Sequence, residues 1–247
     1  MKAFKKHLLT EGRLSVRDMN MVVFAIIMPV IVLVILGILY GDRPAFPGAD
    51  YSFLEQSFGA LCSISICAGG LMGLPLVVAE YRERKILKRF HVTPVRPIML
   101  LMVHLCIYGI YAAVSAFSLW LITKIFWGFQ FRGGLGIFFA GWLLVLVSTL
   151  SIGILVGGIA RNSKSASVIA SILYFPMLVF SGATLPYEVM PDSMQKIVSI
   201  FPFTQGIKLL KASVLGLPLT NMVFCVMITV IVAAGCTIAA VKWFRWE

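Results

Sequence analysis

The sequence predicts an all-α polytopic membrane protein with six transmembrane helices, organised as a single membrane domain over residues 1–247. The first observation is composition: 60% of the residues are hydrophobic and 13% are charged, whereas soluble domains are about 45–50% apolar and about 25% charged. The second is a mean hydropathy of +0.97. The third is a series of charge-free apolar runs, each near the roughly 20 residues that a helix needs to cross a bilayer.

Six apolar runs follow one another along the chain. Their predicted bounds are residues 21–40, 58–79, 98–122, 135–159, 166–185 and 219–241. Their length and continuity argue against membrane-spanning strands, which alternate in polarity over about ten residues. None of the runs contains Asp, Glu, Lys or Arg. This argues against an ion-coupled carrier, because such carriers keep ionisable groups within the membrane.

The basic residues lie between the runs and predict the orientation of the chain. With both termini in the cytoplasm, roughly 15 of the 21 Lys and Arg residues fall on the inner side and 6 on the outer side. The positive-inside rule favours this arrangement. The net charge of +11 is therefore explained by membrane topology, and nucleic-acid binding is not expected. The sequence predicts a multi-pass protein of the cell membrane that contacts lipid directly.

Two segments outside the spans show helical apolar stripes. Phe4 and Leu8 share one face of residues 2–19, which predicts an amphipathic helix on the inner membrane surface. The alternative is an unstructured positive tail. After Pro191 the sequence predicts two short helices that dip into or lie on the outer leaflet, and the alternative is a plain extracellular loop. Pro29 is expected to kink the first span.

A basic segment, "AEYRERKILKRFHVTPVRP", separates the second and third runs at residues 79–97. If its first half is helical, Ile86, Leu87 and Phe90 form one apolar ridge, and Glu80 can pair with Arg84 four residues later. A short cytoplasmic helix with an apolar ridge flanked by charge predicts a docking site for a partner protein. The alternative is that these cations only anchor the ends of the spans to lipid.

Signals of covalent chemistry do not accompany these features. The sequence has no G-x-x-x-x-G-K-[ST] phosphate loop, and its five cysteines, all within spans, match neither a zinc nor a disulfide pattern. No cofactor or metal is expected in this chain. If it transports a substrate, the energy is expected to come from another polypeptide.

Three segments resemble the membrane subunits of type-2 ABC exporters, whose fold also occurs in the ABCG-like (type V) transporters. They are "VRDMNMVVFAIIMPVIVLVILG", "EYRERKILKRFHVTPVRP" and "FSGATLPYEVMPDSMQKIVSIFPFT". The resemblance implies a permease that is not itself an enzyme. It implies two permease subunits, identical or homologous, above two soluble ABC ATPases that bind ATP and magnesium, in a bacterial cell membrane.

The resemblance also implies roles for individual residues. The residues expected to couple to the ATPase are Glu80, Arg82, Glu83, Arg84, Ile86, Leu87 and Phe90. Those expected along the pathway, with core packing as the alternative, are Leu71, Met72, Phe175, Met177 and Phe180. Those expected near an outer gate are Met194, Ile197 and Phe201.

The charge-free spans favour a hydrophobic or amphiphilic substrate, and the small size of the chain favours a drug or antibiotic. The resemblance to exporters implies that the substrate is moved outward. A lipid, a lipid-linked glycan and a hydrophobic peptide are alternatives. A membrane scaffold that transports nothing and a lipid-modifying enzyme are the competing classes of function.

Overall fold

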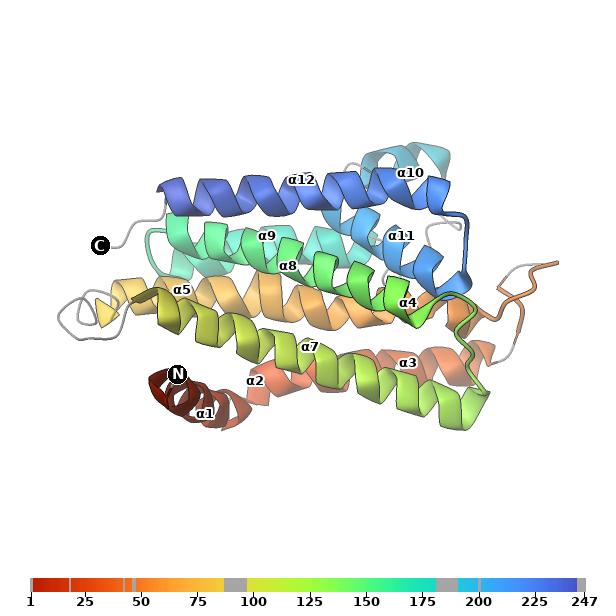
Figure 1. Ribbon diagram of the computed structural model, residues 1–247, viewed down its shortest axis with the longest axis horizontal. Coiled ribbons are helices and arrows are strands. Elements are labelled where there is room, and N and C mark those ends of the chain that lie inside the picture. Colours follow the sequence, from red (N-terminus) through yellow and green to blue (C-terminus); the bar gives the residue numbers. More distant parts are fainter. Residues whose placement is uncertain are drawn as a thin grey trace.

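A computed structural model describes residues 2–17, 19–41, 43–45, 48–86, 97–180, 191–199 and 201–243. The described residues form an elongated helical bundle without a named strand (Figure 1). The first half contains α1 (Lys2–Arg17), α2 (Met19–Val22), η1 (Val23–Ile27), α3 (Met28–Tyr40), α4 (Phe53–Cys67), η2 (Ala68–Gly73) and α5 (Leu74–Glu83). The second half contains α7 (Pro97–Trp127), α8 (Leu135–Ile159), α9 (Ser163–Phe180), α10 (Asp192–Val198), α11 (Pro202–Leu215) and α12 (Leu219–Trp243).

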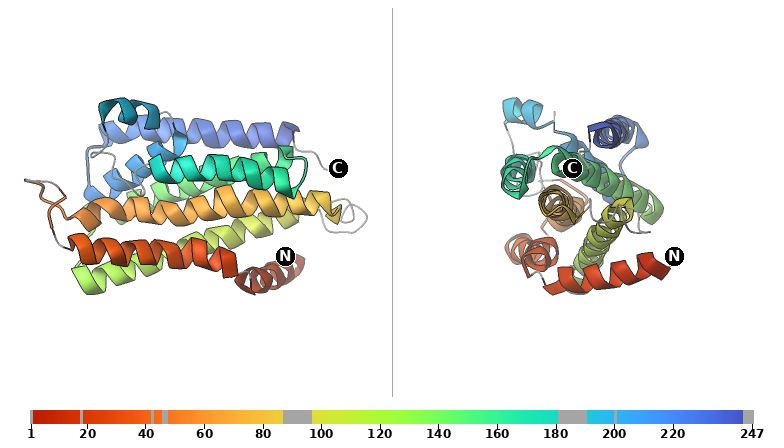
Figure 2. Two further views of the ribbon diagram at one scale, coloured as in Figure 1. Left: turned by 180° about the vertical axis from the view of Figure 1, so that it is seen from behind. Right: turned by 90° about the vertical axis from the view of Figure 1, so that its left-hand side faces the viewer.

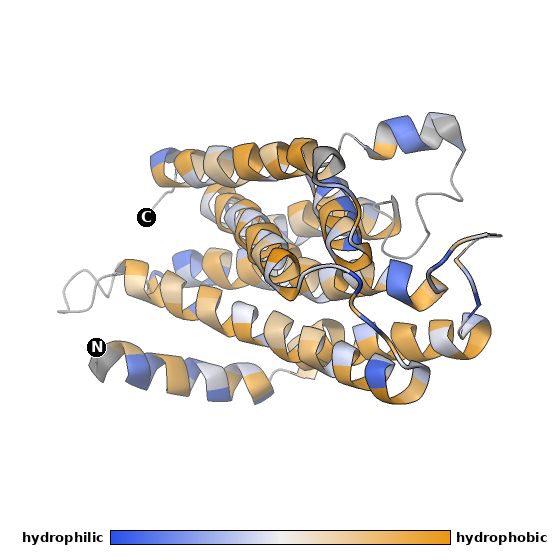
Figure 3. Ribbon diagram, turned by 45° about the vertical axis from the view of Figure 1, so that its right-hand side comes forward, coloured by the Kyte–Doolittle hydropathy of each residue, from blue (hydrophilic) through white to orange (hydrophobic). Residues whose placement is uncertain are grey.

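The prediction of a polytopic all-α membrane protein is confirmed. Among the described residues, five continuous helical stretches are long and apolar enough to cross a membrane: Met19–Tyr40, Phe53–Glu83, Ile98–Trp127, Leu135–Ile159 and Met222–Trp243. The predicted span 166–185 appears as the shorter helix α9, and its last five predicted residues lie outside the described part of the chain. Figure 3 shows hydrophobic residues along the bundle and hydrophilic ones along α1 and near the helix ends.

Two spans contain a π-helical turn immediately before a proline. In η1 the Met28 N–H bonds to the Val23 carbonyl, and in η2 the Leu74 N–H bonds to the Gly69 carbonyl. Pro29 and Pro75 follow directly. Proline has no N–H, and its ring displaces the carbonyl four residues earlier, so the preceding turn widens to a five-residue bond. The distortion expected at Pro29 is therefore a π-turn.

Glycines bring α8 into close contact with the second span. A methyl group added at Gly153 would overlap the carbonyl oxygen of Gly70 in η2. One added at Gly157 would lie 2.7 Å from the Cβ of Val78 and 2.9 Å from the Pro75 carbonyl oxygen. Such small residues permit close helix approach in membranes, and here they place α8 directly against η2 and α5.

The two short helices after Pro191 are both present, and they differ in environment. α10 lies at the outer end of the bundle (Figure 1). α11 is instead buried between α4, α8 and α12 along most of its length. Its Leu210 backbone comes so close to Gly59 of α4 that an added Cβ would be 2.9 Å away. The sequence predicts that the two short helices either dip into the outer leaflet or lie on it. α11 extends into the bundle and does not lie on its surface.

The outer ends of the helices are joined by a polar cluster. Ser52 and Glu55 form a reciprocal capping box at the start of α4, with hydrogen bonds of 3.0 and 3.1 Å. The Glu55 carboxylate also lies 3.3 Å from Nε of Arg132, in the loop before α8. The backbone N–H of Arg132 in turn donates to the Val214 carbonyl of α11. This cluster therefore ties α4, α8 and α11 together.

α1 lies across the opposite end of the bundle, nearly perpendicular to the long helices (Figure 2, right). Phe4 and Leu8 pack against the hydrophobic core, whereas Leu9 is exposed. The predicted amphipathic helix is thus confirmed. α1 and the C-terminal end of α12 are at the same end of the molecule (Figure 1).

Candidate functional site

The candidate site begins where α5 leaves the bundle, because the predicted coupling residues are concentrated there. α5 continues the second span to Glu83, so Glu80, Arg82 and Glu83 form its last turn. The Lys85 N–H then bonds to the Arg82 carbonyl, and Lys85 adopts a φ of 54°. A left-handed residue ends an α-helix. The condition set for the apolar ridge, one helix through the first half of this segment, is therefore not met at Lys85, where α5 has ended; residues 87–96 lie outside the described part of the chain.

Arg82 binds the C-terminal end of α8. Its Nη1 donates to the Gly157 carbonyl at 2.9 Å and to the Ala160 carbonyl at 2.7 Å. These carbonyls are among the last four of α8 and its cap, which have no donor within their own helix. The guanidinium also lies at the negative end of the α8 dipole. Arg82 thus caps a helix that is distant in sequence.

Glu83 binds the N-terminal end of α9. Its Oε2 accepts hydrogen bonds from the Ser163 N–H at 2.9 Å and from the Ser163 hydroxyl at 2.5 Å. A carboxylate is favourable at this end of a helix because the first N–H groups are unpaired and the dipole is positive. We call Arg82, Glu83 and their three partners on α8 and α9 the α5 clamp. Arg82 and Glu83 are adjacent and opposite in charge. They therefore bind helix ends of opposite polarity, the C-terminal end of α8 and the N-terminal end of α9.

The remaining coupling candidates have different surroundings. Glu80 and Arg84 form the expected ion pair, 2.8 Å apart, and both side chains are largely exposed. Ile86 is half-buried. Leu87 and Phe90, which complete the predicted apolar ridge, lie outside the described residues. The structure thus separates the coupling candidates into Arg82 and Glu83, which bond to neighbouring helices although Glu83 is exposed, and Glu80 and Arg84, which pair with each other.

α1 is fixed to the bundle beside this site by two contacts that the sequence analysis did not identify. The Tyr111 hydroxyl of α7 donates to Ser15 at 3.0 Å. Nε2 of His104 lies 3.9 Å from Glu11, while its Nδ1 faces the Leu100 carbonyl at 3.1 Å. His104 is only 7% exposed, and each of its ring nitrogens faces an oxygen atom. Sequence spacing gave no signal for either pair, because the partners are about 95 residues apart.

The pathway candidates are not gathered on one surface. Leu71 and Met177 are buried within the subunit, and Met72 is half-buried. Phe175 is 56% exposed on α9. The side chain of Phe180 lies outside the description. Within one subunit, core packing therefore describes Leu71 and Met177, whereas Phe175 faces outward.

The outer-gate candidates are only partly described. Met194 and Ile197 belong to α10, but their side chains lie outside the described part of the chain. Phe201 precedes α11 and packs, half-buried, against the hydrophobic core. The five cysteines are free thiols. Within the described ranges there is no group of three or more His, Cys, Asp or Glu side chains that could hold a metal ion.

Comparison with known proteins identifies the family of this chain. Residues 7–215 match the family described as ABC-2 type transporter. The Inner membrane transport permease YhhJ of Escherichia coli (strain K12) is 29% identical over 167 residues, which are 67% of this chain and 44% of that protein. The Probable multidrug ABC transporter permease YbhS of the same strain is 28% identical over 145 residues, 58% of this chain and 38% of that protein.

A third relative matches a shorter region. Nodulation protein J of Rhizobium leguminosarum bv. viciae is 29% identical over 85 residues, 32% of this chain and 33% of that protein. In each of the three relatives, the matched region spans less than half of the relative's length. The family match, by contrast, covers most of this chain and all but the last of its predicted spans. The chain belongs to the ABC-2 type transporter family.

Proposed function

We propose that this chain is the membrane-spanning permease subunit of an ATP-driven ABC exporter. Separate ABC ATPase subunits, two copies in the assembly, supply the energy and bind ATP and magnesium. A second permease subunit, identical or homologous, completes the pathway. The chain itself hydrolyses no ATP in this scheme, and its sequence has no phosphate-binding loop.

The α5 clamp is the observation that supports this proposal best. A transporter driven from outside needs a stiff connection between the docking segment and more than one membrane helix. Arg82 links the end of α5 to α8, and Glu83 links it to α9. A partner that moves the segment after Glu83 therefore acts on the ends of three helices at once. α1, held by Ser15 and Glu11, provides a second element at the same end.

A hydrophobic or amphiphilic drug or antibiotic is the favoured substrate. The membrane helices present large apolar side chains at their surface, including Ile172 and Phe175 of α9. A pathway next to such surfaces suits a substrate without fixed charge, because a charged group in the membrane is costly. The name of one relative, a probable multidrug permease, supports the same substrate class. A lipid, a lipid-linked glycan or a hydrophobic peptide is the alternative.

Reconstitution with the cognate ATPase tests the proposal. The chain and the soluble ABC ATPase with which it co-purifies are placed in proteoliposomes, and ATP hydrolysis is measured across a panel of hydrophobic drugs. We expect hydrolysis that depends on the permease and rises with a subset of the drugs. Leu87→Asp and Phe90→Asp are expected to abolish ATPase association and to leave membrane insertion unchanged.

Two outcomes would contradict the proposal. If Leu87→Asp and Phe90→Asp both still bound the ATPase, the segment that contains these residues would not be the docking site. An ATPase that binds the chain but hydrolyses ATP at the same rate with or without it, for every compound tested, would favour the scaffold alternative. Stimulation by lipids or lipid-linked glycans alone would keep the exporter and change its substrate.

A further inference from the structure

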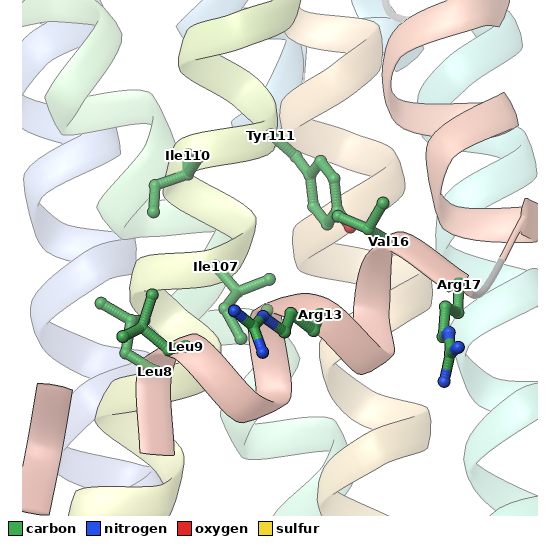
Figure 4. Close-up of a pocket in the computed structure, with 9 residues that line it drawn as sticks. Leu8, Leu9, Arg13, Val16, Arg17, Ile107, Ile110 and Tyr111 are labelled. Carbon is green, nitrogen blue, oxygen red and sulfur yellow. The ribbon is translucent and has the colours of Figure 1, made fainter. Parts of the chain in front are cut away.

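A groove of about 700 Å³ lies along the contact between the amphipathic helix α1 and α7 (Figure 4). Its apolar walls come from both helices: Leu8, Leu9 and Val16 of α1, and Ile107, Ile110 and Tyr111 of α7. We call it the α1–α7 groove. It is open to the outside, and none of the ATPase-coupling or pathway residues discussed above lines it.

Polar contacts hold the two walls of the groove at a fixed spacing. The Tyr111 hydroxyl bonds to Ser15 near one end, and His104 faces Glu11 near the middle of α1. Phe4 and Leu8 are packed against the core. The groove is therefore a built feature of the interface between α1 and α7, and its walls cannot close without breaking these contacts.

Two arginines give the groove its charge. Arg13 and Arg17 line it, four residues apart on α1. Within the described residues neither guanidinium has a hydrogen-bond or ion-pair partner. Figure 4 shows Arg13 beside Ile107, between the apolar residues of the two walls, and Arg17 at the far end of α1 with its side chain pointing away from them. Like charges at this spacing repel each other, so an anion between or beside them is favoured.

The apolar wall of the groove continues along α7 toward the opposite side of the membrane. Ile110, Val114, Phe117 and Leu121 are 40–61% exposed and lie at intervals of three or four residues. At 1.5 Å per residue this stripe is about 16 Å long, which is close to half of the roughly 30 Å hydrocarbon core. Its length therefore matches one leaflet.

A cationic end joined to an apolar track one leaflet long is complementary to an amphiphile with an anionic head and an apolar chain. We propose that the α1–α7 groove binds one anionic phospholipid of the inner leaflet. Its phosphate contacts the Arg13 guanidinium, with Arg17 at the mouth, and an acyl chain lies along Ile107, Ile110 and the exposed stripe of α7. Basic pockets between membrane helices on the cytoplasmic side recognise anionic headgroups by this combination of charge and shape. The bound lipid fastens α1 to α7.

Native mass spectrometry of the full chain, purified from nanodiscs of equal parts phosphatidylglycerol and phosphatidylcholine, tests the inference. We expect one phosphatidylglycerol to remain bound to each chain after mild detergent exchange. The double variant Arg13→Ala, Arg17→Ala is expected to lower that occupancy by about tenfold or more, as loss of charge-assisted hydrogen bonds to a phosphate implies. The matched control is the double variant Lys5→Ala, Lys6→Ala, which removes the same charge from α1 outside the groove. It is expected to leave the phosphatidylglycerol occupancy unchanged.

A second variant fills the groove without removing charge. A Cβ added at Gly12 meets no atom within 4 Å, so Gly12→Leu places its side chain in open space, and it also raises helix propensity. We expect this variant to insert, to keep or raise its thermal stability in lipid-free detergent, and to lose the bound phosphatidylglycerol.

Three results would overturn the inference. They are equal retention of phosphatidylcholine and phosphatidylglycerol by the wild-type chain, no retained lipid at all, and an arginine variant that retains as much phosphatidylglycerol as the lysine variant. None of these readouts depends on ATP hydrolysis or on the substrate, so failure here is distinguishable from failure of the proposed exporter.

Discussion

Adjacent charged residues at the end of α5 have unlike environments. Arg82 and Glu83 each bond to another helix, whereas Glu80 and Arg84 pair with each other in solvent. The difference follows from the helix geometry, since successive residues point about 100° apart. The side of α5 that faces α8 and α9 meets the unpaired carbonyl and N–H groups at the ends of these two helices. Charge alone therefore does not distinguish the residues that bond to other helices from those that pair with each other in solvent.

Replacement of Arg82 tests the α5 clamp. Arg82→Ala leaves the Gly157 and Ala160 carbonyls without their donor, so we expect the free energy of unfolding to fall by about 1–3 kcal/mol. We also expect drug-stimulated ATP hydrolysis to fall several-fold while the ATPase still co-purifies. Arg84→Ala, which removes an equal charge from an exposed ion pair, is the control and is expected to change stability by less than about 1 kcal/mol. Unchanged drug-stimulated hydrolysis in Arg82→Ala would show that the clamp does not transmit the motion.

The outer ion pair provides a second test at the residue scale. Glu55 is 8% exposed and Arg132 contacts it at 3.3 Å. We expect Glu55→Gln and Arg132→Met each to destabilise the protein, with a coupling of about 1–2 kcal/mol in a double-mutant cycle. The coupling is expected to stay in this range because the Arg132 side chain is 42% exposed and water screens the pair. Thermal unfolding in detergent measures this coupling energy, and Lys196→Ala is the control at an exposed position. If the two single effects were additive, the ion pair between Glu55 and Arg132 would not stabilise the protein.

At the scale of elements, α8 organises the bundle because its glycines let it touch the second span. Gly153 faces Gly70 at the π-turn η2, one turn before Gly157 meets Val78. The widened turn and the two glycines bring backbones into direct contact. The same helix receives Arg82 at its end. α8 therefore takes part both in the close glycine contact with the second span and in the α5 clamp.

A methyl group placed in this contact tests its importance. Gly153→Ala is expected to cost about 1–3 kcal/mol, because the new carbon overlaps the Gly70 carbonyl oxygen and one backbone must shift. Gly136→Ala is a control on the same helix, since its added carbon meets nothing within 4 Å, and it should be neutral or slightly stabilising. Thermal unfolding of both purified variants gives the comparison. Unchanged stability of Gly153→Ala would show that α8 and η2 separate freely.

At the scale of the whole molecule, the exposed face of α9 is the expected contact with a second permease subunit. Val168, Ile172, Phe175 and Val179 lie on one side of α9 at intervals of three or four residues, and all are exposed. The opposite side packs against α5 and η2. α9 thus joins the clamp to this face. In the proposed exporter, motion that enters at Glu83 would reach the boundary between the two subunits through α9.

Photo-cross-linking in native membranes tests this arrangement. A benzophenone side chain at Ile172, which is 65% exposed on α9, is expected to cross-link two permease chains. The same group at Ile231, which is 67% exposed on α12, is the control and is expected to react with lipid only. A dimer band at Ile231 and none at Ile172 would move the interface to α12.

Much of the fold was predictable because the bilayer imposes simple rules on sequence. Charge-free runs of about 20 residues gave the spans, and an apolar stripe beside lysines gave α1. Spacing of four residues gave the Glu80–Arg84 pair. The site was less predictable: the break at Lys85 and the partners of Arg82 and Glu83 depend on which helices pack beside α5. Local patterns contain no information on such contacts.

The sequence by itself determined that the chain is helical, crosses the membrane repeatedly and concentrates charge at one end, since each of these follows from hydrophobicity and charge along a single stretch. Only the tertiary structure decided that α11 is buried, that Gly153 touches Gly70, and that Arg82 and Glu83 bind α8 and α9. The physical reason is the sequence separation of the partners. Contacts between residues 75 or more positions apart, as in the clamp, exist only after the helices have packed.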